Sequence, residues 1–233
     1  MDPKTALAPA DRMVDLSHVL EEGIPFWPTH PRYEHKLMET YERGDIFCQY
    51  GINLGEHSGT HFDAPMHIIP GGASIDQVPI SQVCGRAATI DASHLGANGV
   101  LEASAIEAWE EEHGPIEAGD CVLIRFGWDR HWGLGSEGGG FMQDWPGISG
   151  ESASLLVGRG VRMVGTDALS IDVFTSAEAA PAHRILLGSD VLIGENFNRL
   201  DSLPAHCTLL AFPLPIKGGS GSPVRPVAIL PEE

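Results

Sequence analysis

The segment GEHSGTHFDAPMH, residues 55–67, places the strongest constraint on how this chain can fold. Gly59 and Pro65 interrupt it, and neither is favourable inside a helix, because glycine loses more conformational freedom than other residues and proline lacks a backbone N–H. Four side chains that bind metals fall at odd positions: His57, His61, Asp63 and His67. Because strand side chains alternate, an extended backbone would direct all four to one face. We therefore predict an extended segment here.

The extended segment must also bend. A straight strand rises about 3.3 Å per residue and would separate His57 from His61 by roughly 13 Å, which is too far for both to bind one ion. The sequence between them, residues 58–60, contains Gly59, and glycine allows sharp turns at low cost. His61 and Asp63 are only two positions apart and can share an ion with little distortion.

The residue types in this segment suit a catalytic metal ion. Two imidazoles and a carboxylate are ligands for Zn²⁺, Mn²⁺ or Fe²⁺, and three protein ligands leave room for water, whose pKa such an ion can lower to about 7. A single histidine is more often a surface or core residue, but three histidines and an aspartate within eleven residues favour a metal site. We predict His57, His61 and Asp63 as ligands. His67 follows them and is predicted to move protons, since the unperturbed pKa of histidine is near 6.5.

The rest of the chain predicts an α/β fold with a mixed sheet and flanking helices. Residues 101–113 have an amphipathic helical pattern that ends at Gly114 and Pro115, and residues 149–159 also indicate a helix. Apolar runs at 121–126, 161–165 and 206–215 predict strands. The length of 233 residues suits a single domain, 1–233. Strands outnumber helices and neither GxGxxG nor GxxxxGK[ST] occurs, so a nucleotide-binding fold is not indicated.

Composition excludes several classes of partner. The formal net charge is −18, from 32 acidic and 14 basic residues, and a surface of this sign repels nucleic acid. No apolar run approaches the ~20 residues that a membrane span requires, and the N-terminus lacks a signal-peptide pattern. The four cysteines form no CxxC pair and are expected to be reduced, mostly buried thiols. A cytoplasmic protein without nucleic-acid or membrane partners is the expectation.

Residues 126–147, FGWDRHWGLGSEGGGFMQDWPG, are dense in glycine and aromatic side chains. Two interpretations stay open for this stretch. Its aromatic side chains either cover a flat ligand or form a small cluster of their own within a surface insertion: Trp128, Trp132, Phe141 and Trp145.

The segment HSGTHFDAPMH resembles the HxGTHxDxPxH signature of the cyclase-like metal-dependent hydrolases, a family that includes bacterial kynurenine formamidase and isatin hydrolase. The resemblance extends to DLSHVLEEGIPFWPTHP at residues 15–31, to residues 108–129, and to PLPIKGGSGSPVRPVAIL at residues 213–230. It therefore covers nearly the whole chain. The family fold is a compact mixed α/β domain related to swivelling β/β/α arrangements, which agrees with the predicted strands.

The resemblance implies roles for further residues. It makes His57, His61 and Asp63 ligands of a first metal and His67 the proton donor or acceptor. In the formamidase branch a second metal is held by the same aspartate, a later histidine and a glutamate twelve residues after that histidine. His183 and Glu195 have this spacing. Because isatin hydrolase lacks this glutamate, Glu195 favours the arrangement with two ions.

Other implied roles concern the substrate and the assembly. Trp27 matches a family tryptophan that contacts the aromatic part of the substrate, although a tryptophan beside a proline is also a common loop anchor. The stretch that follows the predicted strand at 161–165 resembles a loop near the family's pocket, but its polar side chains also suit turn caps, and we do not assign them a catalytic role: Asp167, Ser170 and Asp172. The family resemblance also implies a homodimer or a higher homo-oligomer.

The motif together with the family resemblance implies an enzyme that binds one or two Zn²⁺ or Mn²⁺ ions and hydrolyses a C–N bond of a small aromatic carbonyl compound. An isatin-like cyclic amide and an N-formylkynurenine-like formamide both fit this description. Three alternatives remain: a lactone or ester hydrolase, a ring-forming cyclase, and a metal-binding protein without catalysis.

Overall fold

The computed structural model describes residues 9–232. Residues 1–8, which belong to the stretch without a signal-peptide pattern, and Glu233 lie outside the described part. A nine-stranded mixed sheet forms the body, in the order β1-β13-β11-β5-β7-β9-β10-β4-β12. Its strands are β1 Met13–Asp15, β4 His61–Asp63, β5 Cys84–Asp91, β7 Cys121–Arg125, β9 Met163–Thr166, β10 Leu192–Glu195, β11 His206–Leu210, β12 Gly221–Pro223 and β13 Val227–Ile229.

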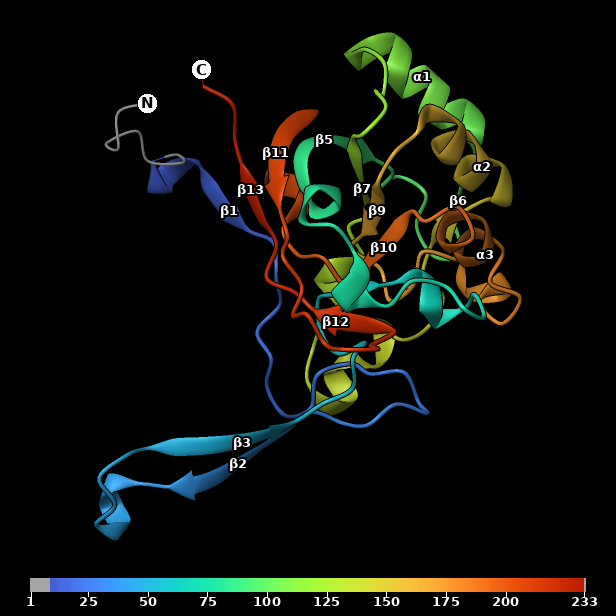
Figure 1. Cartoon of the computed structure of the whole chain (residues 1–233). Coiled ribbons are helices and arrows are strands. Elements are labelled where there is room, and N and C mark those ends of the chain that lie inside the picture. The colour runs from blue at the N-terminus through green and yellow to red at the C-terminus, as the bar shows by residue number, and fades with distance from the viewer. Residues whose placement is uncertain (1–8, 233) are drawn as a thin grey trace.

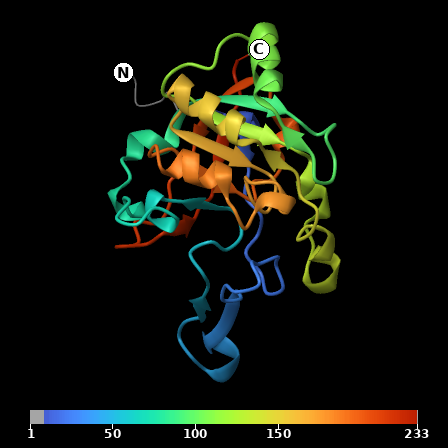
Figure 2. The same ribbon diagram turned by 90° about the vertical axis from the view of Figure 1, so that its right-hand side faces the viewer.

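The centre of the sheet is parallel and is built from strands that alternate with helices. β5, β7, β9 and β10 pair in parallel, and the chain between them forms α1 Ala103–His113, α2 Gly150–Arg159 and α3 Pro181–Leu187. Gly114 ends α1, and Gly160 ends α2 in a left-handed conformation with a φ of 74°. Figure 2 shows the three helices on the same side of the sheet. The predicted α/β fold with a mixed sheet is confirmed.

The alternation of side chains along the central strands divides the core into two clusters. Val122 and Ile124 of β7 pack with helix residues such as Leu156, whereas Cys121 and Leu123 pack in the cluster on the opposite face. Strands buried on both faces in this way read as continuous apolar runs, which is why CVLIRF was recognisable as a strand.

One strand boundary and one burial prediction differ from the sequence-based expectation. The late strand stops at Leu210 rather than extending to residue 215, because Pro213 and Pro215 lack the N–H groups that a strand pairs. Cys121 and Cys207 are buried and burial raises the pKa of the Cys121 thiol to about 12 and that of Cys207 to about 11. Cys48, however, is exposed. None of the described helices is both long and apolar enough to span a bilayer.

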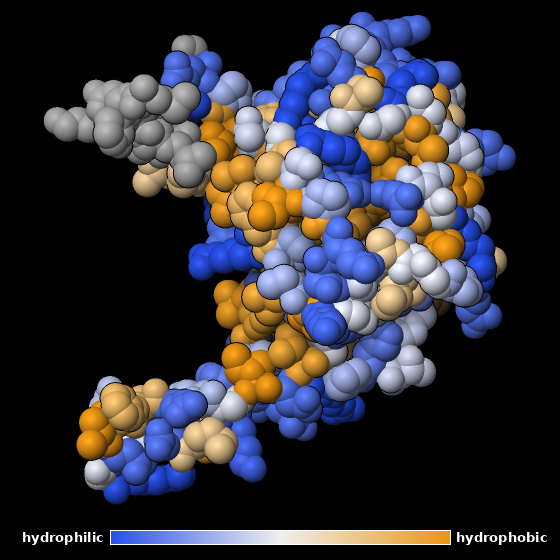
Figure 3. All heavy atoms as spheres, viewed as in Figure 1, coloured by the Kyte–Doolittle hydropathy of each residue, from blue (hydrophilic) through white to orange (hydrophobic). Residues whose placement is uncertain are grey.

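A β-hairpin stands clear of the body. It consists of β2 Glu34–Glu39 and β3 Gln49–Asn53, which pair only with each other. We call residues 34–53 the arm. Figure 1 shows the arm projecting away from the large sheet, and Figure 3 shows that it makes a concave outline with the body. A separate small sheet joins β6 Val100–Leu101 to β8 Gly147–Ile148.

Candidate metal centre

The register of three neighbouring strands places the predicted ligands together. β4, which carries His61 and Asp63, lies between β10 and β12 and runs antiparallel to both. Glu195 of β10 is the direct partner of His61. Gly221 of β12 is the direct partner of Asp63. Because side chains two positions apart share a face, the side chains of His61 and Asp63 point to the same side as that of Glu195.

The predicted bend lies at Gly59, whose φ is 63°. A side chain there would be strained by this φ, and its Cβ would lie 2.6 Å from a methyl carbon of Leu20. The Gly59 carbonyl accepts a hydrogen bond of 2.8 Å from the amide of Asn196. The strand itself covers only residues 61–63, so His57 reaches the site from beyond the bend rather than along a straight strand.

Asp63 is the centre of the cluster. Its side chain is 1% exposed, and its two oxygens face different imidazoles. Oδ1 lies 2.6 Å from Nδ1 of His57 and 3.4 Å from Nε2 of His61. Oδ2 lies 3.3 Å from Nε2 of His183. One carboxylate thus faces His57 and His61 on one side and His183 on the other.

Glu195 spans the same two sides. Its Oε2 lies 3.5 Å from Nε2 of His61, and its Oε1 lies 3.4 Å from Nε2 of His183. The backbone N–H of Ile171 donates a hydrogen bond of 2.9 Å to Oε1, which fixes the carboxylate. The structure therefore brings His183 and Glu195, which the sequence places far from the motif, into contact with Asp63 and His61.

Hydrogen bonds at the far ring nitrogens orient two of the imidazoles. Nδ1 of His61 lies 2.9 Å from the Gly59 carbonyl, which only accepts, so this nitrogen is the donor, and Nε2 faces the carboxylates of Asp63 and Glu195. Nδ1 of His183 lies 2.6 Å from Oδ2 of Asp172. Metal-binding histidines commonly show this second contact to a carbonyl or a carboxylate. Sequence analysis assigned Asp172 no such role, because its distance from His183 along the chain gives no signal of contact.

His57 has the opposite ring orientation, with Nδ1 rather than Nε2 directed at the cluster. Its Nδ1 faces Asp63, and its Nε2 lies 2.9 Å from the hydroxyl of Ser220. The Ser220 hydroxyl donates a hydrogen bond of 2.7 Å to Glu56. Ser220 and Glu56 were not predicted, because 164 positions separate them in the sequence and only the pairing of β4 with β12 brings them together.

The donor set and its spacing fit a divalent cation. Nitrogen and oxygen ligands of one tetrahedral ion at about 2.1 Å from it lie about 3.4 Å from one another. The four N···O distances from His61 and His183 to the carboxylates, 3.3–3.5 Å, match this spacing and are longer than strong charge-assisted hydrogen bonds. Asp63 Oδ2 is buried and has no hydrogen-bond partner among the described residues, so a cation would satisfy it.

The ligand atoms form two groups, each within 4.8 Å: His57, Asp63 and His67, and His61, Asp63 and Glu195. The predicted first set of His57, His61 and Asp63 is thus divided between two groups that share Asp63. His67 lies as near as a ligand would, with its ring centroid 4.1 Å from that of His57.

The imidazoles and carboxylates of the cluster shift one another's pKa values. Burial alone would raise the pKa of Asp63, but the imidazoles of His57, His183 and His61 hold it well below its usual range. Burial opposes a charge on His183 and His61, yet the carboxylates around them raise both pKa values. The Asp63 carboxylate thus favours protonated imidazoles at His61 and His183, and these imidazoles in turn favour an ionised Asp63.

A cavity of about 320 Å³ opens onto the cluster. Trp27 and His67 line it together with the five residues of the cluster, and the His67 side chain is open to solvent on one side. Desolvation in the cavity lowers the pKa of His67. Trp27 packs edge-on against Trp145 at 6.0 Å between ring centroids. His30, which sequence analysis did not select, also lines the cavity, and its ring centroid lies 5.7 Å from that of His57.

Residues 126–147 form an aromatic cluster of their own, one of the two interpretations of this stretch. Trp128, Phe141 and Trp145 are all buried. The Trp128 indole donates to the Phe141 carbonyl at 3.1 Å. Asp167 fixes the start of the stretch by accepting the N–H groups of residues 126 and 127, and burial raises the pKa of its carboxyl to about 7. Trp145 packs against Trp27 and, with Met142, lines a cavity that Trp27 also lines.

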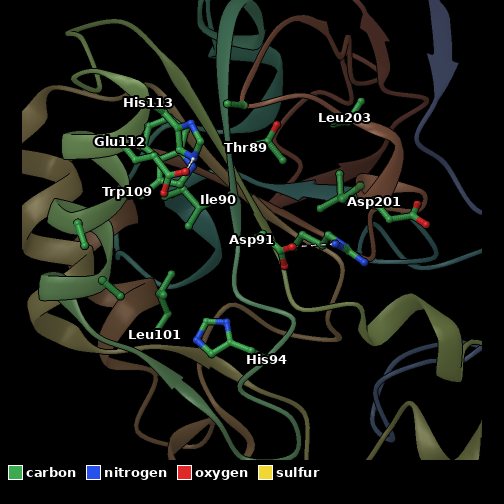
Figure 4. Close-up of a pocket in the computed structure, with 15 residues that line it drawn as sticks. Thr89, Ile90, Asp91, His94, Leu101, Trp109, Glu112, His113, Asp201 and Leu203 are labelled. Atoms are coloured by element: carbon green, nitrogen blue, oxygen red, sulfur yellow. Dashed lines mark hydrogen bonds and ion pairs between the residues drawn. The ribbon is translucent and has the colours of Figure 1, made fainter.

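A larger cavity of about 410 Å³ lies beside α1 and lacks a comparable cluster. Figure 4 shows its polar side chains spread around the rim, with Asp91 directed at a basic group rather than into the cavity. That group is Arg125, which pairs with Asp91 at 2.9 Å. Glu112 lies 3.9 Å from His113. Among the described residues, no third ligand converges with these pairs.

Comparison with known proteins agrees with this geometry. The family profile described as "Putative cyclase" matches residues 14–173. The chain is 34% identical to isatin hydrolase of Roseibium aggregatum over 246 residues, which cover 94% of this chain and 92% of that protein. It is 29% identical to kynurenine formamidase of Erythrobacter litoralis over 220 residues, which cover 93% of each.

The fold agrees as well. The solved structure of isatin hydrolase A from Labrenzia aggregata, bound to benzyl benzoate, superposes with a TM-score of 0.86 at 32% identity and covers 95% of this chain and 94% of that one. The match in sequence includes the segment from His57 to His67. The chain therefore belongs to the cyclase family.

Proposed function

We propose that this protein is a divalent-metal-dependent hydrolase that cleaves the C–N bond of an amide or cyclic amide in a small aromatic carbonyl compound. The observation that carries the proposal is the position of Asp63 and Glu195, which face three imidazoles at the base of a cavity that Trp27 lines. The similarity to isatin hydrolase and to kynurenine formamidase, whose names specify this type of bond, supports it.

The residues of the cluster would hold one or two ions. His57, His61 and Asp63 would bind the first, and His183 and Glu195 would bind the second together with Asp63. When bound, the metal supplies a Lewis acid that polarises a carbonyl group and lowers the pKa of water. Zn²⁺ and Mn²⁺ both suit this set of imidazoles and carboxylates.

His67 would carry out the proton transfers. It accepts a proton from the attacking water and donates that proton to the departing nitrogen. Protonation matters because an amide nitrogen leaves poorly as an anion. The position of His67 in the wall of the cavity, beside His57 rather than inside the sheet, supports this role.

Trp27 would bind the aromatic part of the substrate. It lines both the metal cavity and an adjoining cavity of about 590 Å³, whose walls include Trp145 and Phe174. A flat ring can stack on or pack against these side chains. Isatin and N-formylkynurenine both present such a ring next to the carbonyl carbon that is attacked.

Metal content combined with two assays tests the proposal. The purified chain is analysed by plasma mass spectrometry, and hydrolysis of isatin and of N-formylkynurenine is followed by absorbance. Two ions per chain with formamide turnover support the formamidase-like form, and one ion with isatin opening supports the isatin hydrolase-like form. Stoichiometric metal without turnover of either compound would contradict C–N hydrolysis. A cytoplasmic location and a homodimer stay predictions from the sequence.

A further inference from the structure

A second cavity adjoins the metal cavity. Its volume is about 590 Å³, and it shares four lining residues with the metal cavity: Trp27, Leu169, Ala177 and Glu178. Ala179 lines the adjoining cavity, and the next residue, Ala180, lines the metal cavity. Residues 177–180 therefore form part of the wall between two neighbouring spaces, which a single ligand can occupy together.

The charge of the adjoining cavity has one sign. Among the described residues that line it, Glu178 is the only one with an ionisable side chain. The imidazoles line the metal cavity instead, and no described lysine or arginine lines either space. A carboxylate on a bound ligand would meet the charge of Glu178 here without a cationic partner, whereas an ammonium group would be attracted. The cavity therefore selects the sign of charge on its ligand.

Aromatic rings line the same cavity as this carboxylate. Phe174 is 39% exposed and Trp27 is half-buried, so both rings present surface to a ligand. Trp145 packs edge-on against both, with ring centroids 4.7 Å from that of Phe174 and 6.0 Å from that of Trp27. Its indole N–H donates a hydrogen bond of 2.8 Å to the Asp172 carbonyl, which fixes the ring. Aromatic faces together with a carboxylate suit a protonated amine, because both attract a cation.

Hydrogen bonds hold the turn that carries Glu178. The backbone N–H groups of Ala179 and Ala180 both donate to the carbonyl of Ser176 at 3.0 Å, and the N–H of Phe174 donates to the carbonyl of Trp145 at 3.1 Å. Helix α3, which carries the proposed ligand His183, begins directly after this turn. The carboxylate therefore has a fixed position relative to the metal cluster, and such preorganisation favours binding.

We infer that the adjoining cavity is a subsite for an alkylammonium group, and that the substrate of the metal cavity is an aryl amide that carries a protonated amine but no carboxylate. In an aryl formamide with an aminoalkyl ketone at the ortho position, the ring packs against Trp27 while the formamide and the ammonium group enter different cavities. The carboxylate of N-formylkynurenine would accompany its ammonium group and meet Glu178, so the analogue without the carboxylate fits better. The position of the amide rests on the proposed function, whereas the subsite can be tested by binding alone.

Three aryl ketones that differ only in their side chain test the subsite. Kynuramine carries an ammonium group, kynurenine carries an ammonium group and a carboxylate, and 2-aminopropiophenone carries neither. Titration calorimetry with the metal-loaded protein measures their affinities without any turnover. Kynuramine is expected to bind about tenfold more tightly than either of the others, which corresponds to one exposed ion pair and one cation–π contact together.

Substitutions in the subsite separate charge from shape. Glu178→Gln is expected to weaken kynuramine binding about fivefold and to leave the affinity for 2-aminopropiophenone unchanged. Glu178→Lys should make kynurenine the tighter ligand of the two amines. Phe174→Leu keeps an apolar side chain without the aromatic face, and should weaken kynuramine binding about threefold. Glu151→Gln, at an exposed glutamate of α2 that lines neither cavity, is the control and should retain the wild-type affinities.

Several outcomes would overturn the subsite. These are kynurenine binding as tightly as kynuramine, kynuramine binding that Glu178→Gln leaves unchanged, and no measurable kynuramine binding. Assays with isatin and N-formylkynurenine decide the proposed function separately. A preference for kynuramine without hydrolysis of either compound would support the subsite and contradict the proposed reaction, whereas hydrolysis without this preference would support the reaction and overturn the subsite.

Discussion

The Nε2 atom of His183 lies 3.3 Å from the Oδ2 atom of Asp63, and that oxygen has no hydrogen bond from any described residue. Asp63 belongs to the short strand β4, whereas His183 belongs to helix α3 on the helical side of the sheet. Their contact means that one carboxylate serves two groups of imidazoles. The chemistry that we propose depends on this shared carboxylate more than on any single histidine.

Glu195→Gln should reduce the metal content of the purified protein from two ions to one if two ions bind. The amide retains the size of the side chain but removes the negative charge that faces His61 and His183. We expect turnover to fall at least about a hundredfold, because the charged ligand is lost. Plasma mass spectrometry and steady-state kinetics measure both effects. Glu112→Gln, in the cavity beside α1, is the control, and unchanged metal content in both variants would remove Glu195 from the ligand set.

Asp172→Asn should weaken metal binding about 10–100-fold through the orientation of His183. The carboxylate accepts from the His183 ring at 2.6 Å and from the backbone N–H of Ala182 at 2.7 Å, so it fixes both the ring and the start of α3. Competition with a chromogenic chelator gives the affinity, and thermal unfolding of the metal-free protein reports on the helix. Lower stability with unchanged metal affinity would show that Asp172 stabilises the start of α3 but does not orient His183 for metal binding.

His67→Ala should lower kcat about 10²–10⁴-fold, the usual contribution of a general acid or base, while the metal content stays near the wild-type value. The ring lies beside His57, on a short 3-10 turn that follows β4. Kinetics and metal analysis of the same preparation separate the two effects, with His94→Ala as a control at an exposed histidine. Loss of metal together with activity would instead make His67 a ligand.

Gly221→Ala should impair the metal site although it replaces none of the proposed ligands. A Cβ at this position would lie 2.6 Å from Cε1 of His57 and 2.5 Å from the carbonyl oxygen of Phe62. The imidazole must therefore move, and we expect weaker metal binding and at least about tenfold lower turnover. Gly158→Ala in α2 is the matched control, because its Cβ meets no atom within 4 Å. Equal activity of both variants would show that His57 tolerates displacement.

The stability of the metal-free protein should decrease as the pH rises above neutrality. The pKa values of His61 and His183 are raised from 6.5 by their carboxylate neighbours, despite burial. Their charged forms therefore stabilise the fold fully below pH 6.5, and this stabilisation is lost as the pH rises through the raised pKa values. Metal binding displaces these protons, so the affinity of the protein for the metal ion should increase as the pH rises over the same range. Melting temperatures of both forms between about pH 6 and 9 measure the effect, and a rising melting temperature for the metal-free form would contradict it.

The sequence by itself determined the local features of the site. Gly59 and Pro65 exclude an α-helix through the motif, and the structure has the bend at Gly59 and a strand at residues 61–63. The predicted extended segment does not continue to His67, because Pro65–His67 form a short 3-10 helix. The helices near 103–113 and 150–159 begin and end within two residues of their predicted limits. These features depend on backbone preferences and on side-chain periodicity, which act over a few residues and are therefore written in the local sequence.

Only the tertiary structure decided which distant residues meet. The contact of His183 with Asp172 and the path from His57 through Ser220 to Glu56 depend on how strands pair and where a helix docks, and no local pattern specifies those distances. The family resemblance selected His183 and Glu195, whereas their spacing alone did not. The arm illustrates the same limit, since the alternation of its side chains is local but its separation from the body is a property of the whole fold. Long-range contacts form because the entire core is buried cooperatively, so they follow from the complete chain rather than from any segment of it.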